Sequence, residues 1–115
     1  MSNAWEYSDQ AGFDNASVLG YTVEATDGEI GDVADESTEV HSYHIVVDTG
    51  AWIFEKKRLV PAGAVERIDH GRETVFVALT KAEIKDAPDF VAESVVDNTH
   101  RTDVENYYAP WIGIR

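Results

Sequence analysis

The sequence predicts a mainly β domain: a small six-stranded antiparallel β-barrel with short C-terminal helices. Three observations predict this fold. Apolar and polar residues alternate with a period of two in several short segments, as they do in half-buried strands. Turns containing glycine, aspartate or proline separate these segments at short intervals, which is typical of a closed or nearly closed barrel. After residue 79 the alternation stops and helix-start patterns replace it.

Residues 21–34 predict the first hairpin. Apolar Tyr, Val and Ala alternate with polar residues over 21–25. Asp27 and Gly28 predict a two-residue turn, because glycine accepts the positive φ that such turns require. The apolar residues of the return strand, 29–34, are three apart. Both can face inward only if one residue is extruded, so we expect a bulge at Gly31.

Residues 42–61 predict the hairpin around which the other strands are arranged. An apolar strand over 43–48 leads through a turn into an aromatic patch and a basic turn, Lys56-Lys57-Arg58. A short strand over 58–60 follows and ends at Pro61, where the missing N–H of proline does no harm. Two such strands joined by a short connection are expected to pair antiparallel.

The remaining strands are predicted over 65–69 and 74–79, with a corner at 62–64 and a turn at His70-Gly71. Thr80 and Glu83 form a capping-box pattern, so a helix of about two turns is expected to follow and to end before Pro88. A second capping box, Thr102 with Glu105, predicts another helix start. Four large side chains there are spaced to share one helix face: Val104, Tyr107, Tyr108 and Trp111. So short a helix has to dock on the barrel or on another chain.

These patterns predict three parts of the chain. Residues 1–17 form an N-terminal arm that is either disordered or held in place by its aromatic side chains. Residues 18–90 form the barrel domain. Residues 91–115 form a C-terminal aromatic helical extension. The pattern leaves open whether residues 88–99, which span the boundary between these two parts, are helix or loop.

Composition limits the partners. The chain has 115 residues, with 22 acidic and 9 basic ones, for a formal charge of −13. Phosphate backbones are bound by lysine and arginine, so we expect no nucleic-acid partner. The charge also disfavours anionic membranes, and no apolar run is long enough for membrane insertion. There is no cysteine, which excludes disulfides and thiolate chemistry. The first residues lack the basic-then-apolar pattern of a secretion signal, so a cytoplasmic location is expected.

Several segments together resemble the PRC-barrel family. Residues 19–31, from Leu-Gly-Tyr to Thr-Asp-Gly-Glu-Ile-Gly, resemble its first hairpin. The segment IVVDTGAWIF over 45–54, with Leu-Val-Pro at 59–61, is similar to its middle strands. Residues 79–88 resemble its closing turn, and Tyr107-Tyr108 resembles the aromatic helix that often follows. The resemblance spans residues 18–90 and continues more loosely to the end.

The resemblance implies a six-stranded barrel used as a non-catalytic adaptor. The family includes the cytoplasmic part of the photosynthetic reaction-centre H subunit and the C-terminal domain of the ribosome maturation factor RimM. This sequence resembles a stand-alone barrel. It shows neither the membrane helix of the H subunit nor the N-terminal partner domain of RimM. The H-subunit analogy alone implies a weaker alternative, an accessory role in a photosynthetic or redox complex.

No catalytic, metal or cofactor site is expected. His41 and His44 are three apart on or beside a strand, so their side chains point to opposite faces and cannot chelate one ion. The seven acids between residues 24 and 39 lack the spacing of a calcium loop. The family has no shared catalytic motif to carry over, so the chain is not expected to be an enzyme.

The candidate interaction surface combines aromatic and basic side chains, the composition of many binding hot spots. Its members are Trp52, Phe54, Lys56, Lys57, Arg58, Tyr107, Tyr108 and Trp111. An acidic first hairpin could meet the basic turn of a second copy, which predicts a homodimer. The alternative is a small-molecule-binding barrel or a carboxylate-based enzyme. That alternative requires an interior or end pocket of about 300 Å³ or more with convergent polar groups.

Overall fold

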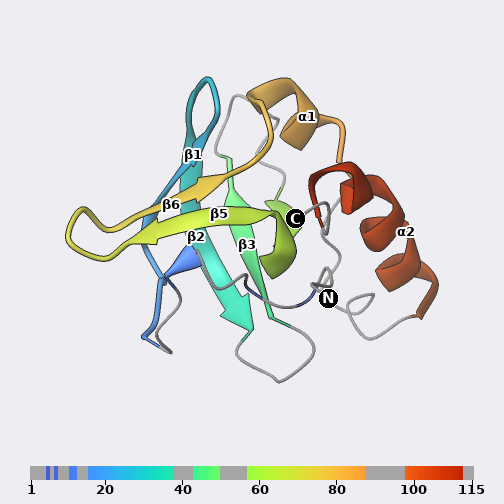
Figure 1. Ribbon diagram of the computed structural model, residues 1–115, viewed down its shortest axis with the longest axis horizontal. Coiled ribbons are helices and arrows are strands. Elements are labelled where there is room, and N and C mark those ends of the chain that lie inside the picture. The colour runs from blue at the N-terminus through green and yellow to red at the C-terminus, as the bar shows by residue number, and fades with distance from the viewer. Residues whose placement is uncertain are drawn as a thin grey trace.

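The computed structural model describes residues 5, 7, 11–12, 16–37, 43–49, 57–87 and 98–112, with the backbone alone for 98–101. The predicted mainly β fold is confirmed: one six-stranded sheet has the order β4-β3-β2-β1-β6-β5 (Figure 1). The strands are β1 (Thr22–Ala25), β2 (Gly28–Ser37), β3 (His44–Asp48), β4 (Lys57–Pro61), β5 (Val65–Asp69) and β6 (Thr74–Val77). The helices are η3 (Ala62–Ala64), α1 (Lys81–Lys85), α2 (Asn98–Tyr108) and η5 (Ala109–Trp111).

The first hairpin forms where the sequence predicts it, with its turn one residue earlier. Ala25 and Gly28 are the last paired residues, and Gly28 has a φ of +137°. The predicted bulge is also present. The pairing passes from Glu24 opposite Glu29 to Val23 opposite Gly31. One extra residue on β2 therefore turns its apolar side chains inward.

The prediction that all strands are antiparallel is wrong. β1 and β6 are parallel, while every other neighbouring pair is antiparallel. The reason is the corner η3, whose residues are all buried. Each hairpin reverses the chain, but this corner does not, so β5 runs in the same direction as β4. One reversal fewer returns β6 parallel to β1.

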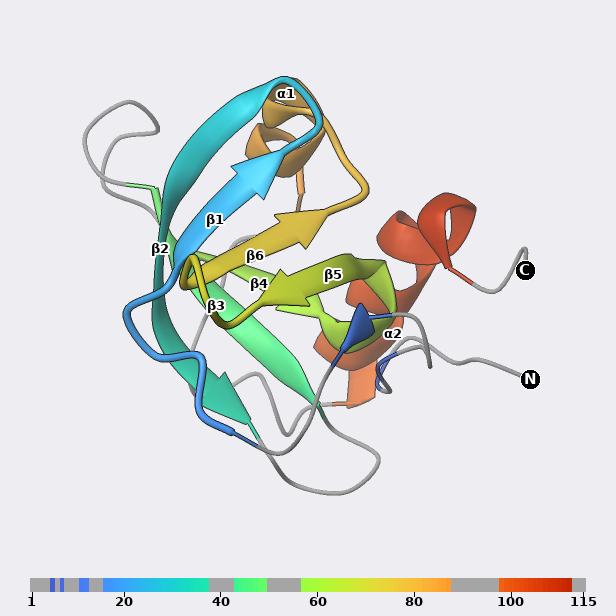
Figure 2. The same ribbon diagram turned by 60° about the vertical axis from the view of Figure 1, so that its left-hand side comes forward.

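The predicted barrel, expected to be closed or nearly closed, does not close. The sheet is curled but stays open between its edge strands β4 and β5, which do not pair. Figure 2 shows the curl, with α2 beside the edge strands β4 and β5. Part of this opening is covered by α2, which packs on β4. A helix on an open edge covers backbone groups that another strand could otherwise pair with.

The inside of the curled sheet is filled with apolar side chains. All six strands contribute to it, and most of these side chains are at most 1% exposed. The fully buried members include Val23, Ile30, Ile45, Val47, Leu59, Val65, Val75, Val77, Leu79 and Ile84. Close packing of this kind is normal for protein interiors. The sheet therefore encloses a core and not a lumen in the part of the chain that the structure describes.

The two predicted capping boxes have different outcomes. At α1 both bonds are present: the Glu83 amide donates to Thr80 Oγ1 at 3.2 Å, and the Thr80 amide donates to Glu83 Oε1 at 2.7 Å. The second box does not start a helix, because α2 already begins at Asn98 and Thr102 lies inside it. Among the described residues, no helix is long and apolar enough to cross a membrane.

Candidate interaction surface

Arg58 of β4 lies inside the molecule. Its side chain is 4% exposed. Its Nε donates to the Ile84 carbonyl at 3.3 Å and its Nη2 to the Lys85 carbonyl at 2.9 Å. These carbonyls end α1 and carry the partial negative charge of a helix C-terminus. Arg58 therefore joins β4 to α1, and it cannot contact a partner while the chain keeps this fold.

Tyr108 is the deepest aromatic residue of α2. It is fully buried, and its hydroxyl donates to the Leu59 carbonyl at 2.9 Å. Burial raises the pKa of Tyr108 above its usual range, and the neighbouring Tyr107 adds to this shift while Arg58 opposes it. The hydrogen bond satisfies a hydroxyl that water cannot reach. Like Arg58, Tyr108 belongs to the core and not to an exposed surface.

Tyr107 and Trp111 lie at the edge of the same cluster. The Tyr107 hydroxyl donates to the Glu83 carbonyl of α1. Burial, followed by the charges of Asp86 and Glu83, raises the pKa of Tyr107. Its ring centroid is 5.2 Å from that of Tyr108 and 5.7 Å from that of Trp111. Both Tyr107 and Trp111 are half-buried, so the aromatic face of α2 docks on its own chain and leaves these two residues partly accessible.

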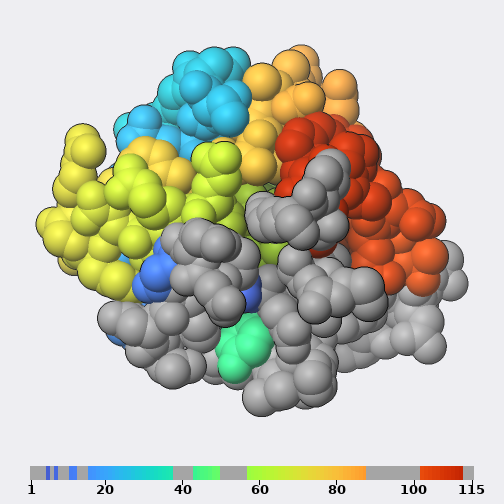
Figure 3. All heavy atoms as spheres, viewed as in Figure 1, coloured from blue at the N-terminus to red at the C-terminus, as the bar shows by residue number. Residues whose placement is uncertain are grey.

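The structure thus divides the predicted surface. Lys57 is exposed, and Tyr107 and Trp111 are partly so. Arg58 and Tyr108 are buried. Trp52, Phe54 and Lys56 lie outside the described residues. Figure 3 shows α2 in red at one side of the molecule and the β5–β6 turn in yellow at the other.

Trp5 of the N-terminal arm ties both ends of the chain to the sheet. It is 4% exposed, and its carbonyl accepts a hydrogen bond from the Tyr43 amide at 3.0 Å. Its indole Nε1 donates to Glu105 Oε2 of α2, and its ring meets that of His44 edge-on at 6.0 Å. Sequence patterns left open whether the arm is held by its aromatics, and at Trp5 it is.

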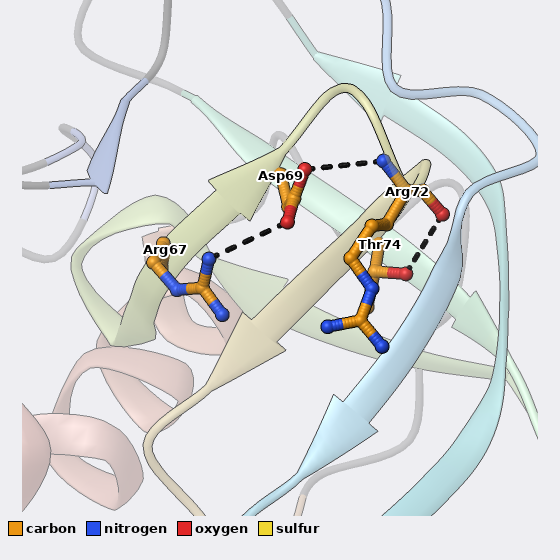
Figure 4. Close-up of polar contacts among 4 residues, drawn as sticks. All are labelled: Arg67, Asp69, Arg72 and Thr74. Carbon is orange, nitrogen blue, oxygen red and sulfur yellow. Dashed lines mark hydrogen bonds and ion pairs between the residues drawn. The ribbon is translucent and has the colours of Figure 1, made fainter.

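Sequence reasoning missed a second surface, on the outer face of β5 and β6. Arg67 is 53% exposed, and its guanidinium carbon lies 4.2 Å from the centroid of the Phe76 ring. Its Nη1 also lies 3.6 Å from Asp69 Oδ2 (Figure 4). Stacking of arginine on an aromatic face is favourable at exposed sites and common in interfaces.

The turn after β5 is held by its own polar contacts, which fix the shape of that surface. Asp69 Oδ1 accepts from the Arg72 amide at 3.1 Å, and Thr74 Oγ1 donates to the Arg72 carbonyl at 3.0 Å (Figure 4). Glu73 has a φ of +51°. At the same end of the molecule, the Tyr21 hydroxyl lies 2.9 Å from His70 Nδ1.

An open hollow of about 510 Å³ lies between β2 and the end of β3. Its lining residues are Glu29, Ile30, Gly31, Asp32, Ala34, Asp48 and Thr49. Asp32 and Asp48 are directly opposite each other on the two strands, a like-charge arrangement that destabilises a sheet. Within the described ranges, no group of three or more histidine, aspartate or glutamate side chains is placed to hold a metal ion.

Comparison of the sequence with protein-family models gave no match, and comparison with curated proteins gave none.

Proposed function

We propose that this chain is a non-catalytic protein-interaction module of the PRC-barrel type whose first partner is a second copy of itself. The observation that carries this proposal is the filled interior of the curled sheet. Side chains such as Val23, Ile45 and Val75 are fully buried there. A ligand-binding barrel keeps a concave cavity with a few convergent polar groups. With its interior occupied, this sheet has its outer wall and its helices for contact with other molecules.

Two local features support the PRC-barrel assignment besides the resemblance in sequence. The first hairpin has its glycines at the turn and at the bulge, as Gly28 and Gly31. The chain then leads through four further strands to a capped helix at Thr80 and an aromatic helix that ends in Tyr107-Tyr108. The sheet is open between β4 and β5, so the proposal is a PRC-type arrangement of strands without a continuous ring of hydrogen bonds.

Self-association is tested by light scattering and sedimentation equilibrium from about 10 μM to 1 mM in 150 mM salt. The proposed function predicts a reversible increase of mass with concentration. Dimers held by small surfaces are weak, so a dissociation constant in the range of about 10–500 μM is expected. A mass that stays at the monomer value of 12.7 kDa up to about 1 mM contradicts the proposed function.

The charge reversal Lys57→Glu tests whether the basic turn is part of the interface between the two copies. Lys57 is the exposed part of the predicted basic turn within the described residues. If the acidic first hairpin of one copy contacts this turn in the other, Lys57→Glu weakens the dimer about tenfold or more. An unchanged dissociation constant places the contact elsewhere on the outer wall and leaves self-association intact.

The alternative function, binding of a small molecule, is favoured by the hollow between β2 and β3. Its carboxylates, Glu29, Asp32 and Asp48, suit a small organic cation such as a polyamine. Isothermal titration with spermidine tests this: a 1:1 heat signal that is lost in Asp32→Asn with Asp48→Asn supports it. Binding that is equally weak in both proteins and disappears in 150 mM salt reflects the overall negative charge alone.

A further inference from the structure

Three residues form a row across the outer face of β5, β6 and β1. Arg67 pairs with Phe76 across β5 and β6. Phe76 pairs in turn with Glu24 across β6 and β1. This outer row (Arg67, Phe76 and Glu24) places a positive charge, an aromatic ring and a negative charge on three neighbouring strands, with the ring in the middle.

The side chains of the outer row point away from the core. Val23 and Val75 are paired next to the row and fully buried, so the alternate residues Glu24 and Phe76 point outward. Arg67 lies on the same side, because its guanidinium covers the Phe76 ring at 4.2 Å. The Arg67 side chain is 53% exposed, while Glu24 and Phe76 are half-buried. Both charges are therefore accessible from outside.

We propose that the outer row is a two-fold docking surface for a second copy of this chain. A two-fold axis that runs parallel to β6, just above Phe76, exchanges the two ends of the row between copies. Arg67 of one copy then lies over Glu24 of the second copy, and the reverse, while the two Phe76 rings, each with its own Arg67 guanidinium against one face, lie beside the axis. A two-fold interface requires this kind of self-complementary surface. The inference rests on the proposed self-association and names its location.

The neighbouring residues fit the same axis. Asp69, Thr74 and Thr22 form the adjacent row on these strands. Thr74 lies at the axis but is buried in its own chain, so it adds no charge there. Under the two-fold operation Asp69 lies over Thr22 of the second copy. Glu29, which pairs with Glu24 on β2, extends the acidic side that Arg67 approaches. Like charges are not brought opposite each other within these two rows.

The arrangement of positive and negative charges along the outer row favours a second copy of this chain over a partner that is mainly acidic or mainly basic. A strongly acidic partner is attracted by Arg67 and repelled by Glu24, and a basic partner is attracted and repelled in the opposite sense. The ion pair with Asp69 is long, at 3.6 Å between Nη1 and Oδ2, and involves one of the guanidinium nitrogens. The remaining N–H groups of that fork can reach a carboxylate across the interface.

The test uses charge reversal in the full-length chain. Arg67→Glu lowers the formal charge of −13 by two, and Glu24→Arg raises it by two. If general repulsion between acidic molecules controls association, the first variant associates less and the second more. The outer row predicts instead that both variants weaken the dimer about tenfold or more, because each brings like charges together. Combining Glu24→Arg with Arg67→Glu restores the opposite pairs and the wild-type charge.

Sedimentation equilibrium at 150 mM salt measures the four proteins. The exposed residues Lys85 and Asp103 serve as controls of equal charge change away from the outer row, as Lys85→Glu and Asp103→Arg. Urea unfolding verifies that each variant is folded. Weakening in both single variants, recovery in the double variant and little change in the controls support the proposal. A wild-type dimer with unaltered single variants, or a double variant as weak as the single ones, overturns the outer row and leaves the proposed function standing. A monomeric wild type overturns both.

Discussion

The indole Nε1 of Trp5 donates a hydrogen bond to the carboxylate of Glu105, 100 residues later in the chain. This bond joins the N-terminal arm to α2, and the Tyr43 amide holds the arm to the start of β3 through the Trp5 carbonyl. Trp5 and α2, which contributes Val104 and Tyr108, are therefore part of the core.

Removing the Trp5 side chain is expected to destabilise the fold. Trp5→Ala leaves a cavity and is expected to cost about 3–5 kcal/mol in free energy of unfolding. Trp5→Phe keeps most of the apolar area but loses the bond to Glu105, and is expected to cost about 1–3 kcal/mol. Urea denaturation measures both, with the exposed residue Leu19 changed to alanine as a control. A loss below about 1 kcal/mol in Trp5→Ala shows that the arm does not hold the fold together.

Arg58 is expected to tolerate replacement poorly. Arg58→Lys keeps the charge but replaces a fork that reaches the Ile84 and Lys85 carbonyls with a single ammonium group. A loss of about 2–3 kcal/mol in free energy of unfolding is expected. The matched change at exposed Arg72, Arg72→Lys, is expected to stay within about 0.5 kcal/mol. Equal effects at both positions are incompatible with a buried guanidinium.

Alanine substitutions at Gly31 and Gly20 distinguish the free-energy cost of a steric clash from that of backbone strain. A Cβ at Gly31 is placed 2.0 Å from the Asp48 carbonyl oxygen, whereas one at Gly20 meets nothing within 4 Å. Both have positive φ, +153° and +81°. Gly20→Ala is expected to cost about 1 kcal/mol from strain alone. Gly31→Ala adds a backbone clash and is expected to cost about 3 kcal/mol or more. Chemical denaturation with equal costs at the two sites contradicts the close approach of β2 and β3.

Stability is expected to fall in alkali because of two tyrosines, the buried Tyr108 and the half-buried Tyr7. Burial is the main cause that raises the pKa of Tyr7 and of Tyr108 above the usual value of 10.0. The unfolded chain releases these protons near that value while the folded chain keeps them, so their stabilising contribution is complete below pH 10 and is lost as pH rises. The slope approaches about 1.4 kcal/mol per pH unit for each residue. Urea unfolding between pH 8 and 11 measures this slope, and a flat profile contradicts the raised pKa of both tyrosines.

The outer row shows why the sequence alone predicts the strands but not their surfaces. An unbroken hairpin that pairs Val65 with Val77 puts Arg67 opposite Val75. The bulge in β5 shifts the register by one residue, so Arg67 pairs with Phe76 instead. The bulge in β5 adds one residue between Val65 and Arg67, and no glycine or other distinctive residue marks it. The alternation of apolar and polar residues therefore could not predict it. At Gly31, by contrast, a glycine between two apolar residues did predict the bulge.

Non-local contacts limit the prediction elsewhere. The Thr80 capping box depends on residues three apart, and it is present as predicted. Whether Arg58 of the basic turn is exposed or buried depends on α1. This helix begins more than 20 residues later in the chain and supplies the carbonyl groups that accept hydrogen bonds from the buried Arg58. The parallel pairing of β1 with β6 likewise results from a corner that does not reverse the chain. Local patterns identify elements, whereas burial of a charged side chain depends on what later folds over it.

The most direct test of the central claim is a dilution series followed by two-dimensional amide NMR from about 1 mM to 20 μM. If the sheet encloses a filled core and associates through its outer wall, chemical shifts change with concentration at outward-facing residues of β1, β5 and β6, such as Glu24, Arg67 and Phe76. Buried residues such as Ile45 and Val47 stay constant. Spectra that are identical over the whole range, or changes confined to residues buried inside the sheet, contradict the claim.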